Sequence, residues 1–334
     1  MTMFSRFQFN QLALGLLWAT LPMSVSAGFT SPAQTLRLPD QTHQIHQTHA
    51  SQLFYHATQH PPAGAALPVA IVLGGGPGFT SWNLQPVQAL IGAQGYKTLL
   101  MDMRGLGENA HLPTAPAHIV AQWVADIEHL RMAQGARQVT LIGHSWGALM
   151  ALLYARHHPE KVAQIVLLNP VDPEKQAMQH LTETIHERNR QQLAASWDDE
   201  LAWNNAVPSQ IDPDQARQIT QRQITQVLPT YFYDYAQGSA YARQFSHRDF
   251  DIDLNVNAWK AYDANPIRYA EMRAWSIPID FMDCHEDPLM PANLNALQSQ
   301  GVLRRVELIA QCGHFPWVEQ PAQFKERMLR LLGT

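Results

Sequence analysis

The stretch VTLIGHSWG, residues 139–147, decides the fold of this 334-residue chain. Its first four residues are typical of a short buried strand, and the apolar run Ala148–His157 that follows is typical of a helix. Between them stands Gly143-His144-Ser145-Trp146-Gly147, which is G-x-S-x-G in the strand-turn-helix setting that confirms this pattern. A sharp turn there lifts the Ser145 hydroxyl above the sheet, and glycine at either flank avoids collisions with neighbouring backbone. The stretch therefore predicts that Ser145 is a nucleophile.

Trp146 directly follows this serine and begins the predicted helix. The first N–H groups of a helix have no partner within the helix, and the helix dipole favours negative charge at this end. We therefore expect the Trp146 backbone N–H to receive a developing oxyanion.

Short apolar runs alternate with longer helical patterns on both sides of this stretch. Such alternation predicts βαβ units and a parallel sheet that is buried on both faces. The predicted parallel strands are Val69–Leu73, Lys97–Met101, Gln138–Ile142, Ile165–Leu168, Ile279–Met282 and Val306–Ile309. The predicted helices are 81–94, 118–134, 146–157, 291–300 and 321–332. Thr35–Pro39 and Gln52–His56 predict an antiparallel edge, which gives eight strands in all.

A general base for the serine is predicted a few residues past the last strand. His314 lies there, within CGHFP at residues 312–316, between a glycine and the terminal helix. The carboxyl ends of parallel strands meet at one edge of a sheet, so His314 can face Ser145 across that edge. None of the other fifteen histidines has this placement.

The acid that orients this base is expected after the strand Ile279–Met282. Asp283, Glu286 and Asp287 compete for the role. Asp287 is preferred because it lies in the turn beyond the strand, with Pro291 opening the next helix. Asp283 still belongs to the strand end and is the second choice.

Neither candidate cluster of metal ligands predicts a metal site. Four adjacent residues at 284–287 cannot all converge on one ion from an extended chain. The histidines near the amino terminus splay to both faces of an extended chain, with no cysteine or carboxylate beside them; they are His43, His46, His49, His56 and His60. We expect neither a metal nor an organic cofactor.

These motifs, taken in order, resemble the α/β-hydrolase superfamily, and within it the prolyl iminopeptidases. The resemblance rests on GGGPG at 74–78, DMRGLG at 102–107, GHSWG at 143–147, DPLMP at 287–291 and CGHFPWVEQP at 312–321. It implies a mostly parallel eight-stranded sheet with helices on both faces, a helical lid insertion, and a catalytic triad of Ser145, Asp287 and His314. It also implies Gly76 as the second oxyanion donor beside Trp146.

The chain departs from the family pattern at three places. Gly74 stands where the family usually has histidine, which leaves the anchoring of that loop unexplained. The loop after Gly107 continues with Glu108-Asn109 instead of the family's polar tail. Trp203-Asn204 does not reproduce the Trp-Glu pair with which iminopeptidases hold a substrate amine; Glu183, Glu187 and Glu200 remain as lid carboxylates, and a solvated helix face is their simpler interpretation.

In this fold the two cysteines end neighbouring parallel strands. Cys284 and Cys312 are therefore expected a few ångströms apart, and a disulfide between them would clamp the loops that carry Asp287 and His314. An exported protein meets the oxidising compartment that such a bond needs.

The chain divides into four predicted parts. Residues 1–27 have the layout of a secretory signal peptide, with Arg6, an apolar run from Leu12 to Met23 shorter than the ~20 residues of a bilayer span, and small residues before a cleavage site after Ala27. The hydrolase core is predicted at 28–170 and 271–334. A polar, aromatic-rich stretch at 171–270 is predicted to be a helical lid inserted between the sixth and seventh strands. We expect the mature protein in the periplasm or outside the cell, without a stable membrane span.

Composition excludes other classes of protein. With 46% hydrophobic and 15% charged residues the chain buries a sizeable core, and a formal net charge of −5 argues against a nucleic-acid partner. The resulting hypothesis is a serine hydrolase that cleaves a small-molecule or short-peptide substrate, first as an aminopeptidase and alternatively as a carboxylesterase. A catalytically silent binder of a small ligand is the further alternative. The sequence does not decide the oligomeric state.

Overall fold

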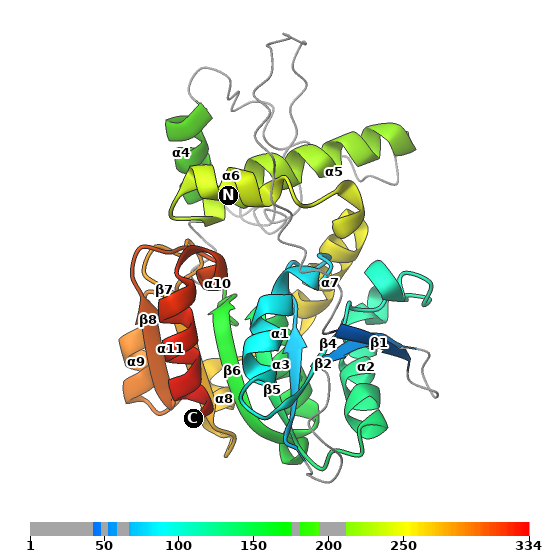
Figure 1. The fold of residues 1–334 in the computed structure, drawn as a ribbon, viewed down its shortest axis with the longest axis vertical. Coiled ribbons are helices and arrows are strands. Elements are labelled where there is room, and N and C mark those ends of the chain that lie inside the picture. Colours follow the sequence, from blue (N-terminus) through cyan, green and yellow to red (C-terminus); the bar gives the residue numbers. More distant parts are fainter. Residues whose placement is uncertain (1–42, 48–52, 59–66, 176–180, 194–211, 334) are drawn as a thin grey trace, which may run out of the picture.

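The computed structural model describes residues 43–47, 53–58, 67–175, 181–193 and 212–333, and an eight-stranded sheet lies at its centre (Figure 1). The strand order is β1-β2-β4-β3-β5-β6-β7-β8. The strands are β1 His43–Gln47, β2 Phe54–Thr58, β3 Val69–Leu73, β4 Lys97–Leu100, β5 Val139–Ser145, β6 Val162–Pro170, β7 Ile279–Cys284 and β8 Arg305–Ile309. β1 and β2 pair antiparallel, as do β2 and β4, and every other neighbouring pair is parallel. The predicted mostly parallel sheet is confirmed.

The antiparallel edge differs in detail from the prediction. Thr35–Pro39 lies outside the described residues, and the strand that pairs with β2 is the histidine-rich His43–Gln47, with His43 opposite Thr58. This segment has few of the β-branched and aromatic residues that predict strands. An edge strand pairs with only one neighbour, and here the backbone pairing with β2 forms the strand although the β-propensity of its residues is low.

Helices follow most strands in the expected places. Outside the insertion they are α1 Gln85–Gly92, α2 Ile119–Ala133, α3 Trp146–His157, α9 Leu294–Ser299, α10 Pro316–Glu319 and α11 Pro321–Leu332. Every residue of β3 and β5 is buried. Because side chains alternate between the faces of a strand, both faces of the sheet are covered.

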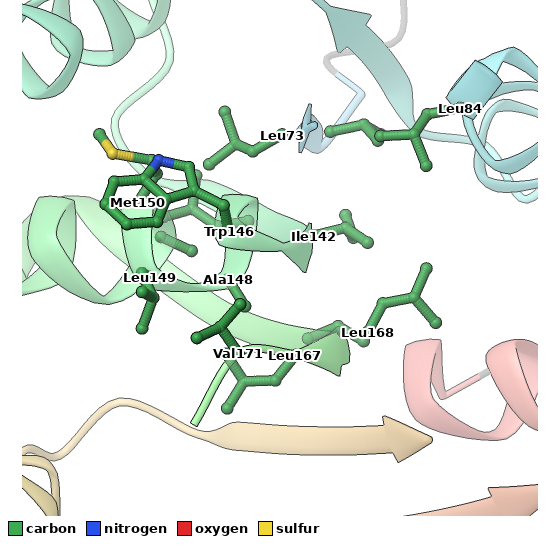
Figure 2. Packing of buried hydrophobic residues seen from close by; sticks show 14 of the residues in the cluster. Leu73, Leu84, Ile142, Trp146, Ala148, Leu149, Met150, Leu167, Leu168 and Val171 are labelled. Atoms are coloured by element: carbon green, nitrogen blue, oxygen red, sulfur yellow. The ribbon is translucent and has the colours of Figure 1, made fainter. Parts of the chain in front are cut away.

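The stretch that decided the fold also lies at the centre of the core. Figure 2 shows Trp146 and Met150 of α3 beside residues from β3, β5 and β6. Leu73, Ile142 and Leu168 are fully buried there. Burial of side chains of this size stabilises the fold by about 1.5–3 kcal/mol each.

Five helices lie between β6 and β7 in the described part of the chain. They are α4 Leu181–Leu193, α5 Pro213–Val227, α6 Tyr235–Ala242, α7 Ile252–Ala264 and α8 Tyr269–Arg273, with the 3₁₀ turn η10 at Leu228–Tyr231 before α6. Figure 1 shows α4, α5 and α6 above the end of the sheet toward which the parallel strands point. Among the described residues, no helix combines the length and apolar character that a bilayer span requires.

The aromatic residues of the insertion extend the main core. The buried ones are Tyr231, Phe232, Tyr241, Phe245, Trp259, Tyr262 and Tyr269. They belong to the same hydrophobic cluster as the sheet residues, whereas Tyr233 is 54% exposed. These rings therefore do not form a separate small core within the insertion, and their packing against the sheet joins the two parts.

The two cysteines form a disulfide. Cys284 ends β7, Cys312 follows β8, and their Cα atoms lie 5.4 Å apart. Both are completely buried. The bond joins the segments that lead to Asp287 and His314.

Replacing both cysteines by serine is expected to lower the free energy of unfolding by about 3 kcal/mol. The bond joins residues 28 positions apart and so restricts the unfolded chain by closing a loop. Denaturant unfolding of the two proteins, both isolated from an oxidising compartment, measures the difference. Thiol titration of the unfolded protein is expected to find no thiol before reduction and two after it. Two reactive thiols before reduction would contradict the disulfide.

Candidate functional site

Ser145 sits in a strained turn between β5 and α3. Its φ of 55° lies in the left-handed region, which is unfavourable for a residue with a side chain. The turn closes tightly because a Cβ on Gly143 would overlap the backbone of Gly147 and Ala148. A Cβ on Gly147 would overlap the carbonyl of Leu73. The requirement for glycine at both flanks, predicted from the motif, is thereby explained.

The Ser145 side chain faces the glycine-rich loop after β3. A Cβ added to Gly75 would lie 2.7 Å from Ser145 Cβ and 3.2 Å from its Oγ. Ser145 is 7% exposed, and Trp146 begins α3 beside it. Gly76 follows with a φ of 127°, which only glycine adopts readily. A side chain at position 75 would therefore displace Ser145.

Asp287 and His314 are joined by a buried hydrogen bond. His314 Nδ1 donates to Asp287 Oδ2 across 2.7 Å, and both side chains are almost completely inaccessible. The other oxygen, Asp287 Oδ1, accepts the N–H of Leu289 at 2.8 Å. Of the two aspartates that the sequence offered, Asp287 is the one whose carboxylate contacts His314.

The surroundings of Asp287 favour its charged form. Burial alone would raise the pKa of this carboxyl, but the charge of His314 and the hydrogen bonds from His314, Asn169 and Leu289 outweigh burial. The pKa of Asp287 therefore lies below its ordinary value. A carboxylate kept charged in this position stabilises a positive charge on the imidazole.

Two backbone contacts fix the position of His314. Its N–H donates to the carbonyl of Tyr231 in η10 at 2.8 Å. Its own carbonyl lies 3.0 Å from Nε2 of His144. A carbonyl only accepts, so His144 Nε2 carries the hydrogen. The His144 and His314 rings lie 4.6 Å apart, and burial followed by the charge of His314 lowers the pKa of His144 well below its ordinary value.

The insertion is bonded to the loop that carries His314. Glu319 Oε2 accepts the N–H of Gly313 at 2.7 Å, and its Oε1 accepts the N–H of Tyr233 at 2.7 Å. Arg188 of α4 donates to the carbonyl of Thr230 and, at 2.8 Å, to that of Glu286. The loops that carry Asp287 and His314 are therefore both hydrogen-bonded to residues of the insertion.

The glycine-rich loop has anchors of its own. Ser81 Oγ occupies the space beside Gly74, 2.6 Å from where a Cβ would lie, and donates to the carbonyl of Met101 at 2.9 Å. The N–H of Ser81 donates to Asp102 Oδ1 at 2.6 Å. From the insertion, the buried amide of Asn255 donates to the carbonyl of Pro77 at 2.6 Å.

The described lid carboxylates lie on a solvated face. Glu183 and Glu187 of α4 are not buried, and Glu187 accepts bonds from Arg190 and Gln191 of the same helix. Glu200 and Trp203-Asn204 lie outside the described residues. Within the described part of the chain, no group of three or more histidine, cysteine, aspartate or glutamate side chains could hold a metal ion.

The sequence did not point to five polar residues that this site uses. They are Ser81, Asn169, Arg188, Asn255 and Glu319. Glu319 belongs to the CGHFPWVEQP stretch, which gave a weak signal, whereas the other four act through contacts with residues far away in the chain.

Comparison with known proteins agrees with the fold described above. The family model described as alpha/beta hydrolase fold matches residues 68–321. A proline iminopeptidase of Lactobacillus delbrueckii subsp. lactis is 24% identical over 264 residues, which cover 77% of this chain and 87% of the relative.

Solved structures agree on the fold. A proline iminopeptidase-related protein of Thermus thermophilus has a TM-score of 0.62 at 18% identity, covering 88% of this chain and 98% of that one. A structure from a study of carboxylesterases of Nitrososphaera gargenis has a TM-score of 0.60 at 14% identity, covering 87% and 98%.

Proposed function

The chain belongs to the alpha/beta hydrolase fold family, and on that premise we propose that it is a serine hydrolase that cleaves an amide or ester bond through an acyl-enzyme. The observation that carries the proposal is the buried Asp287–His314 hydrogen bond, at the same edge of the sheet as the strained turn of Ser145. Nucleophile, base and orienting acid are the three parts that acyl transfer needs.

The proposed reaction has two halves. His314 Nε2 takes the Ser145 proton while Oγ attacks the substrate carbonyl, and the N–H groups of Gly76 and Trp146 receive the oxyanion. The imidazolium, stabilised by Asp287, then gives the proton to the leaving amine or alcohol. Water, deprotonated by the same imidazole, attacks the ester on Ser145 and releases the acid.

Replacing Ser145 or His314 by alanine is expected to lower turnover by about 10⁴-fold or more while the fold stays intact, because each residue belongs to one chemical unit. A fluorophosphonate probe is expected to label the wild-type protein and to leave Ser145→Ala unlabelled. The matched controls are Ser299→Ala and His118→Ala, both at exposed positions. Near-wild-type turnover in either triad variant contradicts the assignment, and a wild type that binds ligands but resists labelling favours a silent binder.

Aminopeptidase activity is the first proposed substrate class. It is supported by the proline iminopeptidases that match most of this chain and by the shared motifs. Carboxylesterase activity is the second, because the same triad cleaves esters and because the α4 carboxylates Glu183 and Glu187 are exposed and provide no buried charge for a substrate amine.

The two substrate classes are separated by comparing proline and alanine naphthylamides with short nitrophenyl esters. An aminopeptidase is expected to show the higher kcat/KM on a naphthylamide with a free amino group and to lose it when that amine is acetylated. Substantial turnover of the esters together with indifference to acetylation would instead establish the esterase.

Export is also proposed. The leader pattern at 1–27 and a disulfide between the only two cysteines both fit an oxidising compartment. The full chain, expressed in a secreting bacterial host, is expected to appear outside the cytoplasm with Gly28 as its first residue, as measured by amino-terminal sequencing. An uncleaved chain retained in the cytoplasm contradicts export.

A further inference from the structure

Asn169 lies near the end of β6, at the centre of the buried polar contacts behind the acid. The residue is completely buried, and its φ of 42° lies in the left-handed region. Asparagine adopts this region more readily than most residues, because its short amide bonds to nearby backbone. A strained, buried asparagine at the end of a central strand is unexplained by core packing alone.

The side-chain amide of Asn169 contacts three oxygens from the two neighbouring strand ends. Nδ2 lies 2.7 Å from Asp283 Oδ1, 2.8 Å from Asp287 Oδ2 and 3.1 Å from the carbonyl of Gly313. The amide has two hydrogens for these three acceptors, so at least one is shared. One side chain of β6 therefore links the acid loop after β7 with the residue that precedes His314.

Asp287 Oδ2 accepts two hydrogen bonds, one from His314 Nδ1 and one from Asn169 Nδ2. The second bond adds a constraint on the plane of the carboxylate, whose other oxygen is held by the N–H of Leu289. A carboxylate that accepts several hydrogen bonds is both oriented and stabilised in its charged form. Loss of the amide would leave the acid with a less defined orientation.

The neighbouring carboxyl, Asp283, takes a different role. It is completely buried, and its Oδ1 also accepts the N–H of Cys284 at 2.7 Å. Burial, followed by the charge of Asp287, raises the pKa of Asp283 well above its ordinary value. Two buried carboxyls that share one amide cannot both be charged without a large cost, so a proton shared by the pair is favoured on Asp283 and the charge on Asp287.

We propose that Asn169 is a positioning residue for the reaction: its amide holds the Asp287 carboxylate and the backbone before His314 in one arrangement, with Asp283 as the neutral carboxylic acid beside them. The inference rests on the proposed serine hydrolase mechanism. Asn169 acts through Asp287 and His314 and has no role in contact with substrate.

Other charged or titratable groups surround the carboxyl pair Asp283 and Asp287 and come from several elements. They are His144 of β5, Arg188 of α4, Tyr231 of η10, Glu286 after β7 and Glu319 of α10. All of them stay unchanged in the variants below, so a difference between variants reports on Asn169 or Asp283.

Asn169→Gly removes the amide and keeps the left-handed backbone accessible. It is expected to lower kcat about 10- to 100-fold with KM changed less than about threefold, the effect of losing one hydrogen bond to a charged group. Without this donor the charge of Asp287 is less dispersed and holds the imidazolium more strongly. The acid limb of the kcat/KM profile is therefore expected to move to higher pH, a change that loose packing alone would not produce.

Two further variants sharpen the test. Asn169→Ser keeps one shorter donor and is expected to change kcat and the acid limb in the same direction but less, which covers the case of a poorly folding glycine variant. Asp283→Asn has the shape of the neutral acid and is expected to keep kcat within about threefold with the acid limb unmoved, as a neutral Asp283 requires. A loss in Asp283→Asn as large as in Asn169→Gly overturns the neutral role of Asp283.

The matched control is Gln311→Gly, an exposed position whose φ of 56° is also left-handed. It carries the same backbone change and is expected to keep wild-type kinetics. An activity-independent readout is the proton NMR signal of His314 Nδ1–H, identified by its absence in His314→Ala and expected to shift in Asn169→Gly. Unchanged kinetics and an unshifted signal in Asn169→Gly overturn the inference, whereas a wild type without labelling or turnover contradicts the proposed function itself.

Discussion

The rest of the site depends on the buried hydrogen bond between His314 and Asp287. A buried carboxylate in such a hydrogen bond is costly to desolvate unless its remaining acceptor positions, and those of its neighbours, are satisfied. Here the remaining contacts come from separate elements: the N–H of Leu289, the amide of Asn169 and the backbone of η10. The disulfide adds a covalent link between the two loops. Polar contacts on the side away from Ser145 thus hold the loops after β7 and β8 in fixed positions relative to each other.

The insertion also helps to hold the His314 loop in position, in addition to covering the end of the sheet. The carbonyl of Tyr231 accepts the N–H of His314, and Glu319 joins Gly313 to Tyr233. Phe232 stacks on Phe315 with ring centres 4.9 Å apart. Any movement of residues 228–234 would therefore break contacts to the base. Substrate entry that keeps the base in place must leave this segment where it is.

The sequence predicted the parts of the fold that follow local rules. Buried strands read as short apolar runs, and the serine turn is recognisable because sterics demand glycine at 143 and 147. The positions of Asp287 and His314 follow from where parallel strands end. The edge strand β1 was missed because backbone pairing, rather than side-chain pattern, forms it. Asn169 and Asn255 were missed because a lone asparagine has no local signature, and its role exists only once distant strands and helices are brought together.

The contacts around Gly74 and Asn109 explain two of the departures from the family pattern. At position 74 the family's histidine is absent, and the Ser81 hydroxyl fills the space that a Cβ on Gly74 would enter. Ser81 then bonds to Met101 and Asp102 at the end of the neighbouring strand. Asn109, in the altered tail, donates to the carbonyls of Asp102 and Phe54 and is completely buried. In this chain Ser81 ties the end of the glycine-rich loop to Met101 and Asp102, and Asn109 in turn holds Asp102, so the loop is anchored without a side chain at position 74.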